Sequence, residues 1–231
     1  MSAQIEKGMD YSTILASSIH DMKNSLGFLL GSLDMVGQQC RAGQCNSASQ
    51  ISRLHYEGKR VNDHLVQLLA LYRMENSQFL VEPQEYCLEE YFQEIMLEHV
   101  DMLDLRNISW RVDCDADLHW FFDGELLSGV LRNIINNLYL YGRDEMLISA
   151  GEEDSFLCIR ISDNGKGYPE QLLSLNENPA GKLDFRSGGT GLGLYFATRA
   201  ARLHRHNKRQ GFIQLSNDGL NGGGCFSIYL P

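Results

Sequence analysis

Long apolar runs are missing from this chain of 231 residues. A helix needs about 18 to 20 consecutive apolar residues to cross a bilayer, and no run approaches that length. The segment from Met1 to Glu6 also lacks the basic stretch followed by an apolar one that is typical of a secretory leader. We therefore expect no membrane span in this chain and a cytoplasmic location.

Excess basic charge and paired cysteines are also absent. Lys and Arg number 20 against 30 Asp and Glu, and the resulting net charge of −10 argues against a nucleic-acid partner. The six cysteines show no metal-ligand spacing, and a hydrophobic content of 43% can fill a core without a disulfide scaffold. We expect reduced thiols in one large or two small domains.

The chain has no P-loop and no catalytic-loop motif of serine/threonine or tyrosine kinases, which excludes those designs for phosphoryl transfer. It has two other glycine-rich segments. Asp163 to Gly167 (DNGKG) follows a strand-like run, and Gly189 to Gly193 (GTGLG) opens a helix. Glycines let the backbone approach a ligand closely, and helix N-termini favour phosphate, although each string alone is also typical of a turn.

A histidine stands beside a helical seam near the start of the chain. Apolar residues recur at alternating steps of four and three from Leu15 to Val36, which predicts one face of a long helix. His20 lies at the edge of this seam, with Asp21 beside it and Asn24 one helical turn later. By itself this pattern is more often an ordinary half-buried histidine than a reactive one.

In combination and in this order, the motifs resemble the histidine kinase core of two-component signalling systems. His20 to Asn24 resembles that family's H-box, and Asn133 to Asn137 (NIINN) resembles its N-box. The two glycine segments resemble its first and second glycine boxes. The resemblance extends from about Met9 to Pro231 and implies an ATP-dependent protein histidine kinase with a GHKL-type ATP-binding domain.

The resemblance implies roles at the phosphoryl acceptor. His20 would attack the γ-phosphorus of ATP and later pass the phosphoryl group to an aspartate of a response regulator receiver domain. Asp21 would orient the proton on the other ring nitrogen. Asn24 would position a water that hydrolyses the regulator's aspartyl phosphate, because an amide both donates and accepts hydrogen bonds. The alternatives are a solvated carboxylate and a solvated amide on the helix surface.

The resemblance also implies a nucleotide site. Asn137 would ligate Mg²⁺ with support from Asn133, and Asp163 would accept a hydrogen bond from the adenine amino group. Local capping is the alternative role for the two asparagines. The glycine-box residues would bring the backbone close to ATP: Gly165, Gly167, Gly189, Thr190, Gly191 and Gly193.

Two positions depart from the family pattern. Ser25 stands where many relatives have proline, which predicts a straighter helix. Leu140 stands where relatives often carry a phosphate-binding cation, and four cations are candidates to replace it: Arg143, Lys166, Lys182 and Arg186. Leu140, and the lack of room for a sensor domain ahead of the helix, keep a second hypothesis open, a dimeric phosphotransfer adapter with a decayed ATP site.

The expected fold class is α+β, with two blocks. In residues 9–78, a second seam from Ile51 to Tyr72 follows a polar loop, which predicts an antiparallel helical hairpin whose remaining apolar surface forms a four-helix bundle in a homodimer. In residues 79–231, strand-like and helical runs alternate irregularly, which predicts an α/β sandwich. The first strand is expected at Phe79–Val81. His204 and His206 are expected on a solvated basic face.

Overall fold

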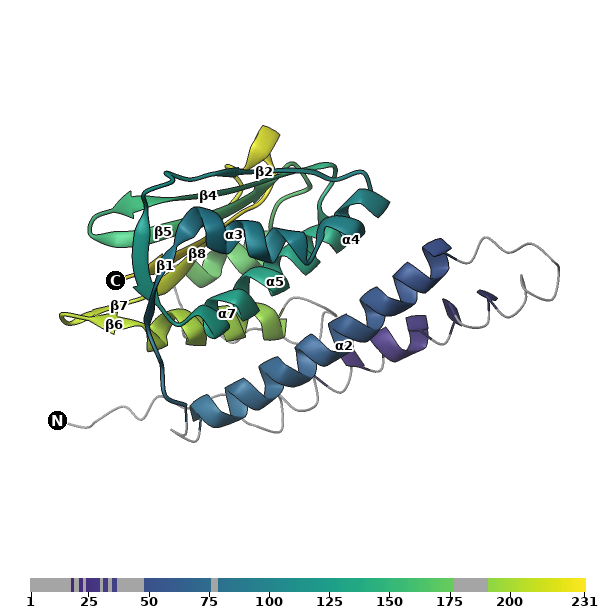
Figure 1. Ribbon diagram of the computed structural model, residues 1–231, viewed down its shortest axis with the longest axis horizontal. Helices are drawn as coiled ribbons and strands as arrows, with labels where there is room; N and C mark the ends of the chain where they lie inside the picture. Colours follow the sequence, from purple (N-terminus) through teal and green to yellow (C-terminus); the bar gives the residue numbers. More distant parts are fainter. Residues whose placement is uncertain are drawn as a thin grey trace. The chain divides into compact units, whose positions relative to one another are not determined.

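The computed structural model describes residues 18, 21–22, 24–29, 31–32, 35–36, 48–75, 79–176 and 191–231 (Figure 1). Its contacts divide the chain into two units, and each is described by itself. The first holds the described residues up to Phe79 together with Gly191 and Leu192, and the second holds those from Leu80 onward. Within these ranges, no helix is both long and apolar enough to cross a bilayer.

The first unit contains two antiparallel helices. The described residues from 18 to 36 are helical, and α2 spans Ala48–Glu75. Nε of Arg60 donates a hydrogen bond of 3.0 Å to Oγ of Ser25. A Cβ added at Gly58 would lie 3.9 Å from Cδ1 of Leu29. Since residue numbers that rise along one helix fall along the other, these contacts confirm the predicted antiparallel hairpin.

The second unit is built on a five-stranded mixed sheet. The strand order is β2-β4-β5-β9-β8, with β2 parallel to β4 and all other neighbours antiparallel. The strands span Ser109–Asp113 (β2), Glu145–Glu153 (β4), Phe156–Asp163 (β5), Phe212–Ser216 (β8) and Cys225–Leu230 (β9). The predicted α+β class is confirmed.

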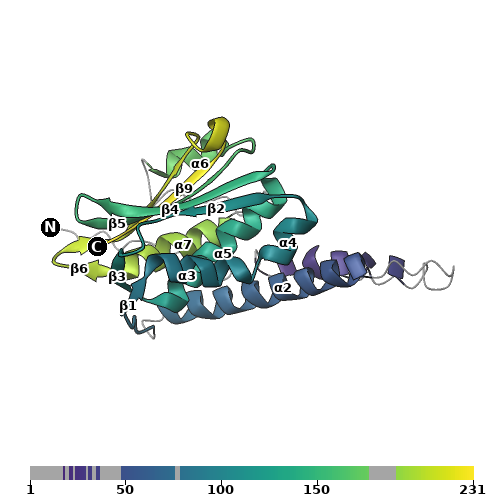
Figure 2. The same cartoon turned by 45° about the horizontal axis from the view of Figure 1, so that its top comes forward.

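Helices cover one face of this sheet, as Figures 1 and 2 show. They are α3 (Leu88–Leu97), α4 (Val100–Leu105), α5 (Gly124–Tyr141) and α7 (Gly191–Leu203). Alternate residues of β5, Leu157, Ile159 and Ile161, are almost fully buried, as are Leu127 and Leu131 of α5. Burying each such side chain stabilises the fold by about 1.5 to 3 kcal/mol, so strand alternation and helical periodicity together form the core.

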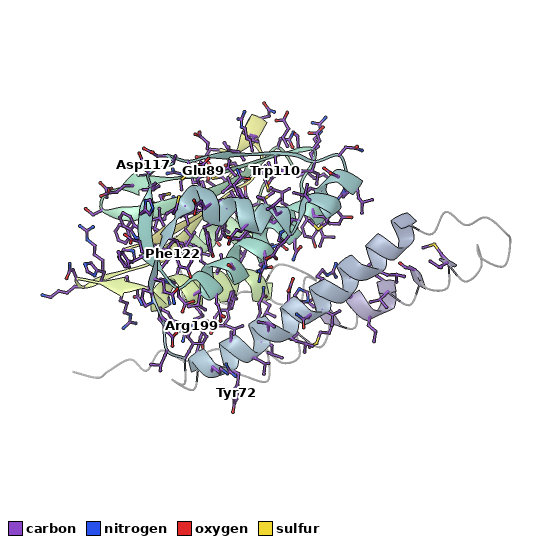
Figure 3. All side chains as sticks on the ribbon, viewed as in Figure 1. Tyr72, Glu89, Trp110, Asp117, Phe122 and Arg199 are labelled. Carbon is purple, nitrogen blue, oxygen red and sulfur yellow. The ribbon has the colours of Figure 1, made fainter. Side chains whose placement is uncertain are left out.

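Small elements close the edges of the domain. Two antiparallel pairs stand outside the main sheet, β1 (Gln84–Cys87) with β3 (His119–Phe122) and β6 (Arg205–His206) with β7 (Arg209–Gln210). Phe122 of β3 is fully buried and stacks on Tyr86 (Figure 3). The described part of the unit also contains the short helices α6 (Glu170–Leu173), η1 (Ser174–Asn176) and η3 (Leu220–Gly222). The Asn176 amide donates a hydrogen bond to the carbonyl of Leu215 and accepts one from its N–H. These bonds pair backbone groups of β8, the edge strand of the sheet.

The first strand was predicted at the wrong place. Residues 79–81 form no strand, and Leu80 is 83% exposed. Pairing begins instead at β1, because β3 lies opposite that segment and supplies its hydrogen-bond partners. The backbone N–H of Glu82 donates its hydrogen bond to the Asp123 carboxylate and not to a carbonyl of a neighbouring strand.

His204 is part of the core, so its predicted place on a solvated face was wrong. Its side chain is 6% exposed, directly after α7. Nδ1 lies 2.9 Å from the carbonyl oxygen of Ala200, and Nε2 accepts a hydrogen bond of 3.0 Å from the backbone N–H of Asp123. These partners require a neutral ring with its hydrogen on Nδ1. Asp123 also caps α5 through Leu126, so His204 ties two helices together. His206 is exposed, as predicted.

Acidification is expected to destabilise this unit through His204. Burial lowers the pKa of His204 below its ordinary 6.5, although Ala200 and Asp123 act in the opposite direction. Unfolding therefore takes up a proton below that pH, so the contribution is complete above about pH 6.5 and is lost as the pH falls. Urea unfolding followed by the fluorescence of Trp110 and Trp120 should show a smaller pH dependence for His204→Gln than for wild type. Equal dependence would contradict this role.

Candidate functional site

Asp163, the last residue of β5, is held by backbone groups at the end of the sheet. Its carboxylate oxygen Oδ1 accepts a hydrogen bond of 2.6 Å from the N–H of Gly165, and its own N–H donates one of 2.9 Å to the carbonyl oxygen of Gly224. Burial raises the pKa of the Asp163 carboxyl above its ordinary value, while the backbone of Gly165 and Gly224 partly offsets that rise. The result is a half-buried carboxylate with a fixed orientation, suited to accept a hydrogen bond from a ligand.

Glycines allow three chain segments to meet at Asp163. A Cβ at Gly165 would lie 2.7 Å from Oδ1 of Asp163 and 3.1 Å from the carbonyl oxygen of Tyr141 at the end of α5. A Cβ at Gly223 would lie 2.1 Å from the carbonyl oxygen of Asp163. Any side chain at these positions would push the segments apart. The first glycine box is therefore needed for the close approach itself.

A side-chain amide fixes the loop that follows. Gly167 has a φ of +73°, which L side chains rarely adopt, and a Cβ there would lie 2.5 Å from Oδ1 of Asn217. The Asn217 amide accepts a hydrogen bond of 2.6 Å from the N–H of Tyr168 and donates one of 2.9 Å to its carbonyl. The ring of Tyr168 packs against Gly224 on the same side as Oδ2 of Asp163.

One face of α5 joins the N-box to both glycine boxes. Asn133, Asn137 and Tyr141 are four residues apart, so they follow one another on the same face. Asn133 is 8% exposed, and a Cβ at Gly193 would lie 1.9 Å from its Nδ2, so its amide lies against the start of α7. At the other end Tyr141 meets Gly165. Asn137 therefore lies between the two predicted glycine boxes.

The amides of Asn133 and Asn137 on this face are available to bind a ligand. Nδ2 of Asn133 is buried without a hydrogen-bond partner, which costs free energy unless a ligand supplies one. Asn137 is half-buried, and we find no partner for its amide among the residues that the structure describes. An amide oxygen is a suitable Mg²⁺ ligand, because this ion keeps most of its positions for water and phosphate. Within the described ranges, no group of three or more His, Cys, Asp or Glu forms an alternative metal site.

The acceptor helix is described in part. His20 lies outside the described residues, while Asp21 and Asn24 are helical, the first half-buried and the second exposed. His64 of α2 faces Asp21, which raises the pKa of that imidazole, although burial has the larger and opposite effect and lowers it. A neutral imidazole on α2 therefore adjoins the predicted H-box carboxylate. In the second glycine box, Gly191 begins α7, whereas Gly189 and Thr190 lie outside the described residues.

Sequence reasoning missed the third segment of the site. Asn217, Gly223 and Gly224 bring the loop before β9 against Asp163. The run Gly222-Gly223-Gly224 was the available signal, since three consecutive glycines rarely serve a simple turn. Asn164 was not assigned a role either, and it is structural, because its Oδ1 accepts hydrogen bonds from the N–H groups of Asp144 and Glu145 at the start of β4.

Comparison with known proteins adds independent information. The family model described as "Histidine kinase-, DNA gyrase B-, and HSP90-like ATPase" matches residues 122–231. The chain is 32% identical over 149 residues to the signal transduction histidine-protein kinase AfsQ2 of Streptomyces coelicolor, which covers 59% of this chain and 27% of that protein. It is 21% identical over 184 residues to the sensor protein VanSC of Enterococcus gallinarum. That match covers 77% of this chain and 51% of VanSC. The chain thus spans about a quarter to a half of these relatives.

Solved structures share the fold. The Acinetobacter baumannii histidine kinase AdeS superposes with a TM-score of 0.63 at 20% identity, covering 91% of this chain and 96% of that one. The catalytic domain of the histidine kinase ThkA gives a TM-score of 0.53 at 22% identity. The match covers 65% of this chain and 95% of the ThkA chain. The second unit and the matched sequence family therefore agree on one architecture.

The contact between Asn133 and Gly193 yields a stability prediction. Gly193→Ala should destabilise the domain by about 1 to 3 kcal/mol, because the new Cβ overlaps the Asn133 amide. In an Asn133→Ala background the same change should cost much less, as the overlapping atoms are gone. Gly151→Ala is the control, since nothing lies within 4 Å of its Cβ position. Urea unfolding measures all four variants, and an equal cost in both backgrounds would contradict the contact.

Proposed function

Because this chain carries the core of a two-component histidine kinase with a GHKL-type ATP-binding domain, we propose that it phosphorylates itself at His20 and passes the phosphoryl group to an aspartate of a response regulator receiver domain. The observation that supports this most strongly is the fixed carboxylate of Asp163. It is held by Gly165 and Gly224 at the end of β5, where a purine amino group could donate to it.

ATP would bind along α5 in this proposal. Asp163 accepts a hydrogen bond from the adenine amino group, and Gly165 and Gly167 let the backbone pass close to the base. The phosphates lie at the second glycine box, Gly189 to Gly193 with Thr190, where glycines and a helix start favour anions. Asn133 supports this end through its free amide nitrogen.

Asn137 would hold Mg²⁺ through its amide oxygen, and the bound ion would neutralise charge on the phosphate oxygens. The half-buried amide without a hydrogen-bond partner fits this role, because no existing bond must be broken to free the oxygen. The phosphates and water would complete the octahedral shell.

At the acceptor, a neutral ring nitrogen of His20 attacks the γ-phosphorus. The new P–N bond forms as the bond to the bridging oxygen breaks, and ADP leaves. Asp21 holds the proton on the other ring nitrogen, which makes the imidazole more nucleophilic.

We propose a homodimer in which two hairpins form a four-helix bundle. Large apolar side chains are exposed on both helices of the single chain, at Leu26, Phe28, Met35, Leu65, Val66 and Leu69. Exposed apolar side chains in this number favour an interface, and two identical hairpins would bury them around one twofold axis.

A second candidate function is a phosphotransfer adapter whose ATP site has decayed. Leu140, 39% exposed, favours it, because relatives often carry a cation at that position. Arg143 and Lys166 are exposed and could replace that charge, while Lys182 and Arg186 lie outside the described residues. The close approach of glycines around Asp163 favours the enzyme. In a decayed site, larger residues would be tolerated at these positions.

The first test is labelling with Mg-ATP. Wild-type protein should gain an acid-labile, alkali-stable phosphate that His20→Gln abolishes, because His20 is the histidine of the proposed H-box. Asn137→Ala should lose both labelling and magnesium-dependent ATP binding, measured by calorimetry, while His20→Gln should still bind ATP. Absence of ATP binding by wild type would favour the adapter, and equal labelling of His20→Gln would remove the acceptor assignment.

Asn24 is proposed to position water for hydrolysis of the regulator's aspartyl phosphate. It is exposed on the acceptor helix, one turn after His20, so its amide can meet a docked partner. Asn24→Ala should therefore slow dephosphorylation of the regulator at least tenfold, about the effect of a lost 1.4 kcal/mol, while autophosphorylation persists. The measurement is the loss of labelled phosphate from the regulator in the presence of wild-type or Asn24→Ala protein. Equal rates with the two proteins would contradict the phosphatase role and leave only the kinase activity.

A further inference from the structure

Positive charge gathers in one stretch of an otherwise acidic chain. No Asp or Glu occurs between Asp184 and Asp218, whereas six Arg or Lys do, against a net charge of −10 for the whole chain. Three of these cations, Arg205, Lys208 and Arg209, lie in the β6–β7 hairpin, where every residue is exposed. The hairpin thus carries a local field opposite in sign to that of the molecule.

The turn of this hairpin places a lysine in a strained backbone conformation. Asn207 and Lys208 have φ values of 46° and 68°, the pattern of a two-residue type I′ turn. Asparagine suits the first position, but glycine is favoured at the second, and lysine is strained there. Strain of this kind points to a role for the side chain at the tip.

The cations retain free donors. Nε of Arg205 donates to the carbonyl of Arg202, and one guanidinium nitrogen of Arg209 donates to the carbonyls of Asp154 and Ser155. In the part of the chain that the structure describes, none of the three hairpin cations forms an ion pair. In the adjoining turn, Arg209 bonds the backbone carbonyl of Asp154 and not its carboxylate, and Glu153 is paired with Arg160 at 2.6 Å.

Aromatic side chains adjoin the hairpin. The guanidinium of Arg209 lies 5.3 Å from the ring centre of Phe156. Phe156 meets Phe212 edge to face, and Phe212, which is 42% exposed, stacks on Tyr229. The hairpin itself lines an open hollow of about 410 Å³ from Arg205 to Gln210. Cations, aromatic rings and a polar hollow therefore share one surface, which we call the hairpin surface.

This surface is remote from the candidate nucleotide site. β5 begins at Phe156 beside the hairpin and ends at Asp163, so the two lie roughly 23 Å apart at about 3.3 Å per residue. Figure 1 shows the hairpin extending from the end of the domain at which β5 begins.

We propose that the hairpin surface docks the domain on an anionic membrane, with the cations at lipid phosphates and the aromatic cluster at the interface. Charge complementarity requires an anionic partner, and the negative charge elsewhere would orient the domain with the hairpin toward it. The exposed ring of Phe212 beside these cations favours a lipid interface over an acidic protein segment, because aromatic side chains partition into the headgroup region. This inference is independent of the kinase activity.

The test is cosedimentation of the full chain with vesicles of phosphatidylcholine, alone or mixed with phosphatidylglycerol. Binding should require phosphatidylglycerol and fall with added salt. Lys208→Gly should weaken it about fivefold, the effect of one cation near the surface, while relieving the strained turn, so unfolding cannot explain the loss. Arg111→Gln is the matched control, since it removes one exposed cation from β2, the edge strand opposite β8, and should leave binding unchanged.

Three outcomes would overturn the proposal. The first is equal binding to both kinds of vesicle. The second is an equal loss in Lys208→Gly and Arg111→Gln, which would indicate a non-specific effect of net charge. The third is absence of vesicle binding together with hairpin-dependent binding of poly-glutamate or inorganic phosphate, which would assign the surface to an acidic protein segment or to a small anion.

Discussion

The hydrogen bonds that join Asp163 to Gly165 and Gly224 are the constraint on which the rest of the site depends: the Gly165 N–H donates to the Asp163 carboxylate, and the Asp163 N–H donates to the Gly224 carbonyl. They join the end of β5 to the loop before β9, and both loops must then run within van der Waals contact of one another. A carboxylate bound by a backbone N–H stays oriented even though burial disfavours its charge. The glycines allow this close approach, and the Asn217 amide fixes the loop that follows Gly167.

Helix α5 is the second organising element, because it contacts both Gly165 and Gly193 of the proposed nucleotide site. Its start is fixed by the Asp123 cap and, through it, by buried His204. Its middle meets α7 where the amide of Asn133 lies against Gly193, and its end meets Gly165. A shift of this helix would therefore move Asn137 relative to both glycine boxes, so stability and the proposed metal binding are coupled through a single helix.

The sequence predicted what depends on local pattern and missed what depends on distant contacts. The seam periodicity indicated the hairpin, and the strand-like and helical runs of residues 79–231 indicated the α+β class, because each signal lies within one element. The place of Asp163 followed from its motif, but the partner loop at Gly223 and Gly224 did not, since only the folded sheet brings β9 beside β5. His204 was assigned to the surface because its neighbours along the chain are basic, whereas its burial is set by Asp123, 81 residues away.

The central claim, that the oriented Asp163 carboxylate selects an adenine amino group, is tested most directly by comparing ATP and GTP binding to the wild-type chain by calorimetry. Guanine presents a carbonyl acceptor where adenine presents a donor, so a carboxylate there should repel it. A charge-assisted hydrogen bond is worth about 1.5 to 3 kcal/mol, which predicts that ATP binds roughly 10- to 100-fold more tightly than GTP. Equal affinities would contradict the account.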